Sequence, residues 1–379
     1  MPHRILQGEH TPAQKKHTMS DNLRQYRAIR AALTQGYPGE PQGQRARHLT
    51  TLAALISGIV ASKRTQLPHI AVKVPDGTQA ESRVKRFARW VNNDTITEEV
   101  YFLPYAEILL AHLALQRLVL VIDGSLVGRG CVALMMHVAY KGRALPLAWL
   151  VRQGKKGHFP EDLHIALVEQ VQELIPLSAS VVLLGDGEFD GTALQHTLET
   201  AGWSYVCRTG CHVTASWDGA TFRLDTVGWC IKPGTLVAFP EASMTREAYG
   251  PILLLCCWAK GYQEPLYLVS NMDTAEEACR LYAKRFRIET FFSDQKSRGF
   301  HLHKSHMKDP TRLSRLLIAA CLAYIWIIYL GALCMQEGVV EIIHRRHRCD
   351  LSLFQLGLRI LDHFLNEDLP IPVAFYICN

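Results

Sequence analysis

Residues 118–125 read LVLVIDGS and residues 181–187 read VVLLGDG, so each segment is an apolar run that reaches an Asp-Gly pair. Short apolar runs bounded by turn residues are typical of buried strands. If the two strands are parallel neighbours, Asp123 and Asp186 lie at the same carboxyl edge of a sheet, where open α/β sheets place their sites. The alternative is that both are ordinary turn residues, because Asp-Gly is a common turn pair.

The segments around these runs alternate between strand and helix patterns. We expect Leu118–Asp123 to be a strand followed by a turn, and Lys141-Gly142 to form a tight hairpin turn. The other elements expected here are the strands Cys131–Tyr140, Ala144–Val151, Val181–Leu184 and Trp203–Cys207 and the helices Glu161–Leu174 and Gly191–Ala201. The order strand, strand, strand, helix, strand, helix, strand resembles the core of the ribonuclease H-like fold.

A β-rich insertion is expected to interrupt this α/β core at residues 209–265, where short apolar runs are broken by Gly and Pro. Its clearest strand candidates are Leu236–Phe239 and Ile252–Trp258. Tyr267–Ser270 then returns to the core. Thr274 is a suitable N-cap and Glu277 stands at the capping-box position, so a helix should begin there and run to about Gly299.

This helix carries a polar stripe. Four polar side chains follow one another at intervals of three, four and seven residues, namely Tyr282, Arg285, Glu289 and Lys296. At 3.6 residues per turn they fall within roughly 60° of one line on the helix. Apolar neighbours flank the line and could anchor the helix to a core. The pattern favours a helix that faces a site, and the alternative is a solvated face with an Arg–Glu pair at i,i+4.

The spacing Tyr-x2-Arg-x3-Glu-x6-Lys resembles the signature of one branch of the DDE transposases of bacterial insertion sequences. Tyr282, Arg285, Glu289 and Lys296 match it without a gap. The surrounding text is similar to that family as well, with VIDGS at 121–125, LLGDGEFD at 183–190, YLVSN at 267–271 and the run SRGFHLHKSHMKDPTRLSRLLIAACLAY that follows Lys296. The resemblance covers roughly residues 45–340.

The resemblance implies a two-metal DNA strand-cleavage and strand-transfer reaction. Asp123 would bridge two Mg²⁺ or Mn²⁺ ions, while Asp186 and Glu289 would each hold one. Carboxylate oxygens suit these hard cations, and two metals about 4 Å apart stabilise both the attacking and the leaving oxygen. Tyr282, Arg285 and Lys296 would contact DNA phosphates, and charged donors suit that role.

The charge of the chain is uneven. Its net charge is +6, but residues 1–100 carry 15 Lys and Arg against 8 Asp and Glu, whereas the remainder carries 26 against 27. A basic, helical N-terminal part favours nucleic acid as partner, although a solvated basic face is the simpler alternative. Val84, Phe87 and Val91 share one face of a helix there. Arg83 and Arg86, on other faces, are our candidates for DNA contact.

Two features bear on the compartment. The eleven cysteines are scattered without a Cys-x-x-Cys pair, and the N-terminus has no apolar signal core, so we expect a reduced bacterial cytoplasm, at the nucleoid.

Leu316 to Met335 contains no charged residue, which meets the length rule for a transmembrane helix. The alternative, which the resemblance favours, is a helix buried in a large domain, with no membrane involved.

Other candidates carry weaker signals. Glu188 and Asp190 lie close to Asp186, which is preferred because it stands at the strand end. Tyr267 is a candidate for stacking on a flipped base, as is known in the family. A basic loop of Lys155, Lys156 and His158 could touch DNA or be a solvated turn. The cluster of His301, His303 and His306 has no acidic partner and more closely matches an exposed or DNA-facing loop than a metal site.

The sequence therefore predicts a mobile tail (1–22), a basic helical DNA-binding domain (23–116), a ribonuclease H-like core (117–208 and 266–340), a β-rich insertion (209–265) and a C-terminal helical segment (341–379). Leu351–Leu365 should be an amphipathic helix. The expected function is cut-and-paste transposition by a homodimer on double-stranded DNA, at the terminal inverted repeats of its element and at target DNA. The alternative is a transposase-derived DNA-binding protein that has lost catalysis.

Overall fold

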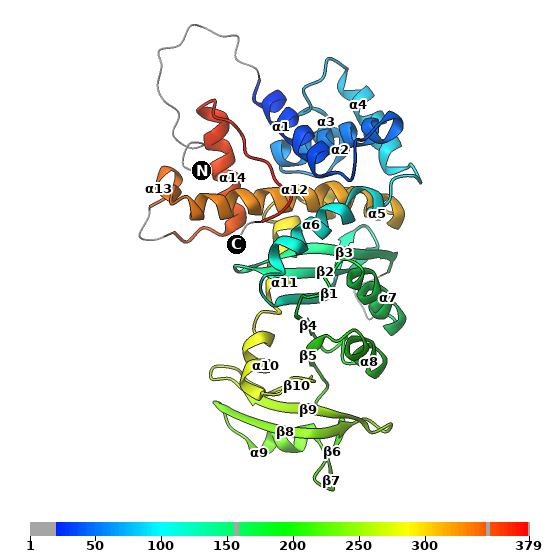
Figure 1. Ribbon diagram of the computed structural model, residues 1–379, viewed down its shortest axis with the longest axis vertical. Coiled ribbons are helices and arrows are strands. Elements are labelled where there is room, and N and C mark those ends of the chain that lie inside the picture. The colour runs from blue at the N-terminus through cyan, green and yellow to red at the C-terminus, as the bar shows by residue number, and fades with distance from the viewer. Residues whose placement is uncertain (1–19, 155–158, 346–348, 378–379) are drawn as a thin grey trace.

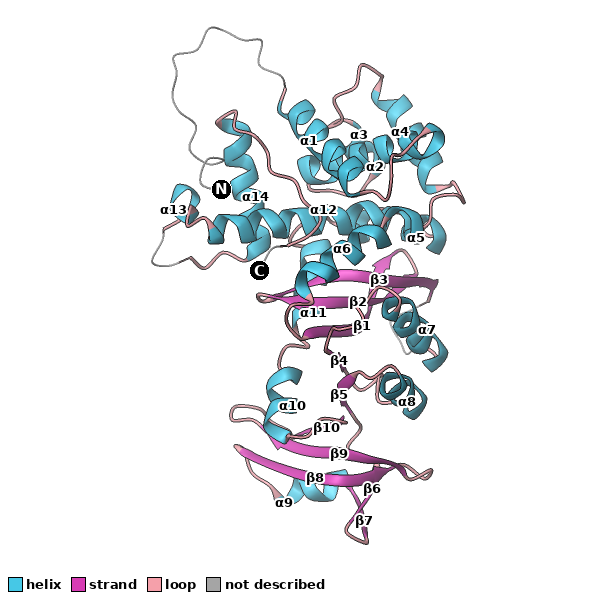
Figure 2. Ribbon diagram, viewed as in Figure 1, coloured by secondary structure: helices cyan, strands magenta, loops and turns pink. Residues whose placement is uncertain are grey.

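The computed structural model describes residues 20–154, 159–345 and 349–377. A large mixed sheet runs along the long axis of the molecule, and a layer of helices covers one end of it (Figures 1 and 2). Most of the expected tail, and the basic loop of Lys155, Lys156 and His158, lie outside the described residues.

The strands follow the order expected from the sequence. They are β1 (Leu118–Gly128), β2 (Cys131–Tyr140), β3 (Arg143–Gln153), β4 (Val181–Gly185), β5 (Ser204–Arg208), β6 (Thr214–Trp217), β7 (Ala220–Arg223), β8 (Thr235–Met244), β9 (Tyr249–Trp258) and β10 (Leu266–Ser270). Their spatial order is β3-β2-β1-β4-β5-β10-β9-β8-β6-β7. β1 is parallel to β4, and β4 is parallel to β5, while β2 is antiparallel to both β1 and β3.

The helices precede, join and follow these strands. They are α1 (Asp21–Gly36), α2 (Gly43–Ser62), α3 (Leu67–Ala71), α4 (Ala80–Val91), α5 (Glu98–Tyr101), α6 (Leu103–Leu113), α7 (Glu161–Gln172), α8 (Thr192–Thr200), α9 (Leu224–Cys230), α10 (Ala275–Tyr282), α11 (Arg287–Gln295), the 3-10 turn η1 (Leu302–Lys304), α12 (Pro310–Gln336), α13 (Val340–Ile343) and α14 (Leu353–Asn366). The predictions of α7, α8, α14 and the strands β2 to β5 are confirmed within two residues.

The prediction that β1 ends in a turn at Asp123 is wrong. β1 continues to Gly128, because β2 supplies an antiparallel partner for each residue through Leu126. Gly124 is paired with Leu134 in this ladder. A Cβ at Gly124 would lie 2.8 Å from the ring of Phe159, so glycine is required here by close packing within a strand and not by a turn.

The insertion does not form a separate unit. β10 pairs antiparallel with β5, and β9 pairs with β10, so the insertion extends the sheet of the core. Strands were expected here, and β8 and β9 include the two segments proposed from the sequence. The helix α9 was not expected. It packs against β9, and a Cβ at its Gly228 would overlap the hydroxyl of Tyr267 at 2.0 Å.

The helix α12 lies between the N-terminal helices and the sheet (Figure 1), and packs against α2, β3 and α14. It is the one helix of the described chain that is long and apolar enough to span a membrane, and 89% of its most apolar window is buried inside the protein. Burial on all sides accounts for its composition. Arg315 on α12 donates to the carbonyl oxygens of Val91 and Ile96 and pairs with Asp94, which fixes the N-terminal layer to the core.

The crossing of α12 and α14 depends on two glycines that face each other's helix. A Cβ at Gly357 would lie 1.9 Å from the carbonyl oxygen of Ile327, and one at Gly331 would lie 2.1 Å from that of Leu353. Backbone atoms cannot give way as a flexible side chain can. The C-terminal helical segment is thereby part of the core formed with α12.

We expect Gly357→Ala to lower the free energy of unfolding by about 1–3 kcal/mol, because the added methyl group must force the two helices apart. Thermal and urea unfolding measure this. Gly77→Ala is the control, because a Cβ there meets no atom within 4 Å. Equal stability of the two variants would show that the helices do not cross as closely as described.

Candidate active site

Asp123 and Asp186 occupy equivalent places on neighbouring parallel strands. The last pair in the register of β1 and β4 is Val121 with Leu184, and each aspartate stands two residues beyond it. Paired strands lie about 4.8 Å apart and side chains alternate between faces, so both carboxylates start from adjacent positions on the same face. The predicted meeting of these residues at one edge of the sheet is consistent with this register.

Arg208 joins this pair and was not among the residues predicted from the sequence. The register of β4 and β5 pairs Gly185 with Cys207, so Arg208 stands beside Asp186. The sequence did contain a sign of Arg208, because it is the polar residue that follows the apolar run of β5. The order of the strands was needed to recognise its place.

The helix expected from Thr274 to Gly299 is broken, which corrects the sequence prediction. α10 ends at Tyr282, and α11 begins only at Arg287. Between them the amides of Lys284 and Arg285 bond three residues back, to Leu281 and Tyr282, in place of the four-residue spacing of an α-helix. Thr274 is the N-cap as predicted, although its side chain forms no capping hydrogen bond.

The break directs Arg285 toward the sheet. Its Nη1 lies 3.7 Å from Oδ2 of Asp123, and its Nη2 lies 3.2 Å from Oε1 of Glu289. Arg285 is 8% exposed, whereas the side chain of Glu289 is 57% exposed. One guanidinium therefore joins two of the three carboxylates named from the sequence, one on β1 and one on α11.

The far end of α11 makes a second contact with β1. Nζ of Lys296 donates to Oγ of Ser125 at 2.6 Å and lies over the ring of Phe292. Ser125 is two residues from Asp123 on the strand, so it shares that face. Arg285 and Lys296 thus attach both ends of α11 to the same face of β1.

A cavity of about 780 Å³ opens beside these groups. Asp186, Arg208, Tyr282 and Arg285 line it. Burial raises the pKa of Tyr282 to about 12, so the phenol remains protonated and can donate a hydrogen bond at neutral pH. The site thus combines carboxylates with guanidinium and phenol donors, which suits a substrate that carries negative charge.

The neighbouring acids are engaged elsewhere. Glu188 accepts a hydrogen bond from the amide of Phe159 and lies 3.6 Å from His164. Asp190 accepts a bond of 2.6 Å from the hydroxyl of Thr209, and burial raises its pKa. These contacts favour Asp186 over both neighbours as the carboxylate of the site.

Two further candidates named from the sequence remain predictions. Tyr267 is 8% exposed and its hydroxyl lies against Gly228, while burial raises its pKa to about 12. His301 and His303 lie with ring centroids 6.0 Å apart, and burial lowers the pKa of both.

The donor chemistry of the site fits a hard divalent cation, because Asp123, Asp186 and Glu289 supply carboxylate oxygens. As the side chains stand, residues 20–154, 159–345 and 349–377 contain no group of three or more His, Cys, Asp or Glu residues gathered closely enough to hold a metal ion. The guanidinium of Arg285 lies between two of the carboxylates instead. Because Glu289 is exposed, its side chain can change rotamer without disturbing the core.

Comparison with known proteins identifies the family of the chain. Residues 115–326 match the family model described as Transposase DDE domain, which is more than half of the chain. This chain belongs to the DDE transposase family. A solved structure described as a piggyBac transposase synaptic complex with hairpin DNA is 13% identical, with a TM-score of 0.47, over 93% of this chain and 79% of that one. None of the curated proteins compared matches the sequence.

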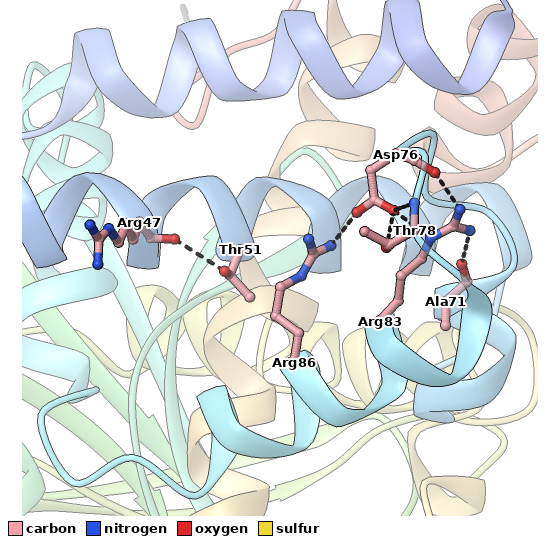
Figure 3. A network of polar contacts seen from close by, with 7 residues as sticks. All are labelled: Arg47, Thr51, Ala71, Asp76, Thr78, Arg83 and Arg86. Carbon is pink, nitrogen blue, oxygen red and sulfur yellow. Dashed lines mark hydrogen bonds and ion pairs between the residues drawn. The ribbon is translucent and has the colours of Figure 1, made fainter.

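The arginines chosen as DNA contacts of this transposase are occupied within its N-terminal layer (Figure 3). Nε of Arg83 lies 2.6 Å from Asp76 and its Nη1 donates to the carbonyl of Ala71, while Arg86 lies 2.8 Å from the other carboxylate oxygen of Asp76. These pairs fix the loop between α3 and α4. Lys85 and Arg89, one turn apart on the same helix, are the exposed cations.

A buried ion pair holds α11 of the transposase on the sheet. Asp294 lies 2.9 Å from Nη1 of Arg143 on β3 and 3.4 Å from the hydroxyl of Tyr324 on α12. Burial raises the pKa of Asp294 to about 6, although Arg143 opposes this shift. Asp294 therefore joins three elements behind the face that carries Glu289.

This pair predicts a pH dependence of stability. The pKa of Asp294 is raised on folding from 3.8 to about 6, so its contribution to stability is full below pH 4 and is lost as pH rises through 6. The loss is on the order of 3 kcal/mol. Unfolding free energies at pH 4 and 6.5 should differ less in Asp294→Asn than in the wild type. The exposed Asp362→Asn is the control. If the unfolding free energy of Asp294→Asn changes between pH 4 and 6.5 as much as that of the wild type, the assignment of the raised pKa to Asp294 is contradicted.

Proposed function

We propose that this transposase is a cut-and-paste enzyme that cleaves DNA at the terminal inverted repeats of its element and joins the freed 3′ ends to target DNA. The observation that carries the proposal is the placement of Arg285 between Asp123 and Glu289, beside the strand that presents Asp186. The chain order and directions of β1 to β5 support assignment of the core to the ribonuclease H-like fold.

Arg285 has a donor to spare for DNA. Its Nε is buried and has no hydrogen-bond partner among the described residues. A DNA phosphate offers charged oxygens in the bidentate geometry that a guanidinium prefers. When Arg285 exchanges its carboxylate partners for this phosphate, Asp123 and Glu289 become available to other cations.

The carboxylates would then act as metal ligands. Asp123, Asp186 and Glu289 would together hold two Mg²⁺ or Mn²⁺ ions. Bound there, the ions would supply an activated nucleophile and charge stabilisation for the leaving oxygen. Tyr282 would donate a hydrogen bond from its phenol to a phosphate oxygen, and Lys296 would hold α11 against β1 and contribute positive charge at the DNA.

The partners follow from this chemistry. Double-stranded DNA would lie across the edge of the sheet and the exposed cations of the N-terminal helices. Bringing together two ends of one element calls for two protomers, so we propose a homodimer in the synaptic complex, in the bacterial cytoplasm at the nucleoid.

We expect Asp123→Asn, Asp186→Asn and Glu289→Gln each to lower metal-dependent cleavage at least about 1,000-fold, because each removes a charged ligand. DNA bearing the repeats that flank the gene is the substrate, with Mg²⁺ or Mn²⁺. Binding in EDTA should survive in all three variants. The exposed Glu276→Gln on α10 is the control. Near wild-type cleavage by one variant would refute that assignment, and no cleavage by the wild type would favour a protein that only binds DNA.

For the N-terminal layer we expect Lys85→Ala with Arg89→Ala to weaken DNA binding and to reduce the slope of log K against log salt concentration by about 2, since two phosphate contacts are lost. Arg83→Ala should instead lower the melting temperature, because Asp76 and the carbonyl of Ala71 lose their donor. Mobility-shift titrations and thermal unfolding separate the two effects. If Arg83→Ala weakens DNA binding and the Lys85 and Arg89 double variant does not, Arg83 is the residue that contacts DNA.

A further inference from the structure

A second basic cavity, of about 420 Å³, lies away from Asp186. It is bounded by the end of α6, the start of β1, the turn between β2 and β3, and the break between α10 and α11. Four cationic side chains line it, namely Arg117, Lys141, Lys284 and Arg287. We refer to it as the distal basic cavity.

The charge of this cavity is poorly compensated. None of its lining residues is acidic. Glu277 at the rim lies 2.5 Å from Arg117 and offsets one charge. Lys141, Lys284 and Arg287 form no ion pair with any described residue. Like charges gathered around one space repel one another, so an anion bound there would be stabilised.

Tyr140, whose hydroxyl is a neutral donor, is one of the residues that line the cavity. It is 6% exposed, and its hydroxyl has no hydrogen-bond partner within the described parts of the chain. Such a buried hydroxyl without a partner is unfavourable, so a ligand acceptor would stabilise it. Gly142 has a φ of +85°, and a Cβ there would lie 2.8 Å from Nη1 of Arg287, so this guanidinium lies against the hairpin turn.

The break in the helix links the two sites. Arg285 reaches Asp123 and Glu289 from this segment, while Lys284 and Arg287 on either side of it line the distal basic cavity. Of these three cations, only Arg285 was expected from the sequence to contact DNA. The neighbouring cations acquire a role only because residues 283–286 do not continue the helix.

The distance between the sites fits a nucleic-acid strand. The cavity contacts Leu118 and Val119, four to five residues before Asp123 on β1. At about 3.3 Å per residue this separation is roughly 15 Å. One strand of DNA carries a phosphate about every 3.4 Å along the helix axis, so a phosphate some four or five nucleotides from the reacting one would reach the cavity.

We propose that the distal basic cavity binds a backbone phosphate of the DNA whose cleavage site lies at Asp123. This inference rests on the proposed function, because it takes that DNA as the ligand. Lys141 and Lys284 provide charge, and Arg287 with the hydroxyl of Tyr140 provides directed hydrogen bonds. The contact sets the position of the strand along β1, and its recognition is of phosphate and not of base sequence.

The test is DNA binding without catalysis. Lys141→Gln with Lys284→Gln should weaken binding of a labelled duplex of about 30 base pairs by about tenfold in EDTA, and should reduce the salt slope by about 1, because one phosphate contact is lost. Lys232→Gln with Lys260→Gln removes the same charge from exposed positions in the insertion, and should change both quantities much less. Circular dichroism of both double variants confirms that they fold.

A second readout identifies the source of the phosphate. Acetylation of Lys141 and Lys284, followed by mass spectrometry, should fall when the duplex is bound and should not fall with inorganic pyrophosphate at equal phosphate concentration. If pyrophosphate protects the two lysines from acetylation and the duplex does not, the assignment of the ligand as DNA is overturned. If the wild type binds DNA and the Lys141 and Lys284 double variant keeps its affinity and salt slope, the cavity proposal fails. If the wild type does not bind DNA, the proposed function fails.

Discussion

The ion pairs of Arg285 connect β1 to α11 at the site. A guanidinium that is almost fully buried must be paired with acids or another acceptor, because an isolated buried charge is strongly unfavourable. Here its partners are Asp123 on the sheet and Glu289 on a helix that arrives after an insertion of more than fifty residues. These contacts hold α11 in position before any DNA or metal binds.

The rest of the molecule supports this arrangement. The pair of Asp294 and Arg143 holds the back of α11, and Lys296 with Ser125 holds its far end. The buried helix α12 lies between the sheet and the N-terminal layer and is fixed to α14 by close glycine contacts (Figure 2). A rigid scaffold of this kind keeps catalytic side chains within the small range of positions that transition-state stabilisation needs.

The sequence was informative where local patterns decide structure. The strands from β2 to β5 and the helices between them follow from apolar runs and turn residues. The spacing of Tyr282, Arg285, Glu289 and Lys296 pointed to Arg285 and Lys296, which contact β1 in the structure. Tertiary contacts decided the rest. Because β1 pairs with β2, it continues as a strand past Asp123 and Gly124. The ion pair of Arg285 with Asp123 occurs at a break between α10 and α11 that no local sequence pattern predicts. Arg208 became recognisable only when β5 was placed beside β4.

The most direct test of the account is a crystal structure of the protein soaked in Mn²⁺ with a cleaved DNA end, using anomalous scattering to locate the ions. The account predicts two ions about 4 Å apart, with a carboxylate oxygen of Asp123 between them and Arg285 turned to a DNA phosphate. Ions bound elsewhere, or Arg285 still paired with Asp123 and Glu289 when DNA is present, would contradict it.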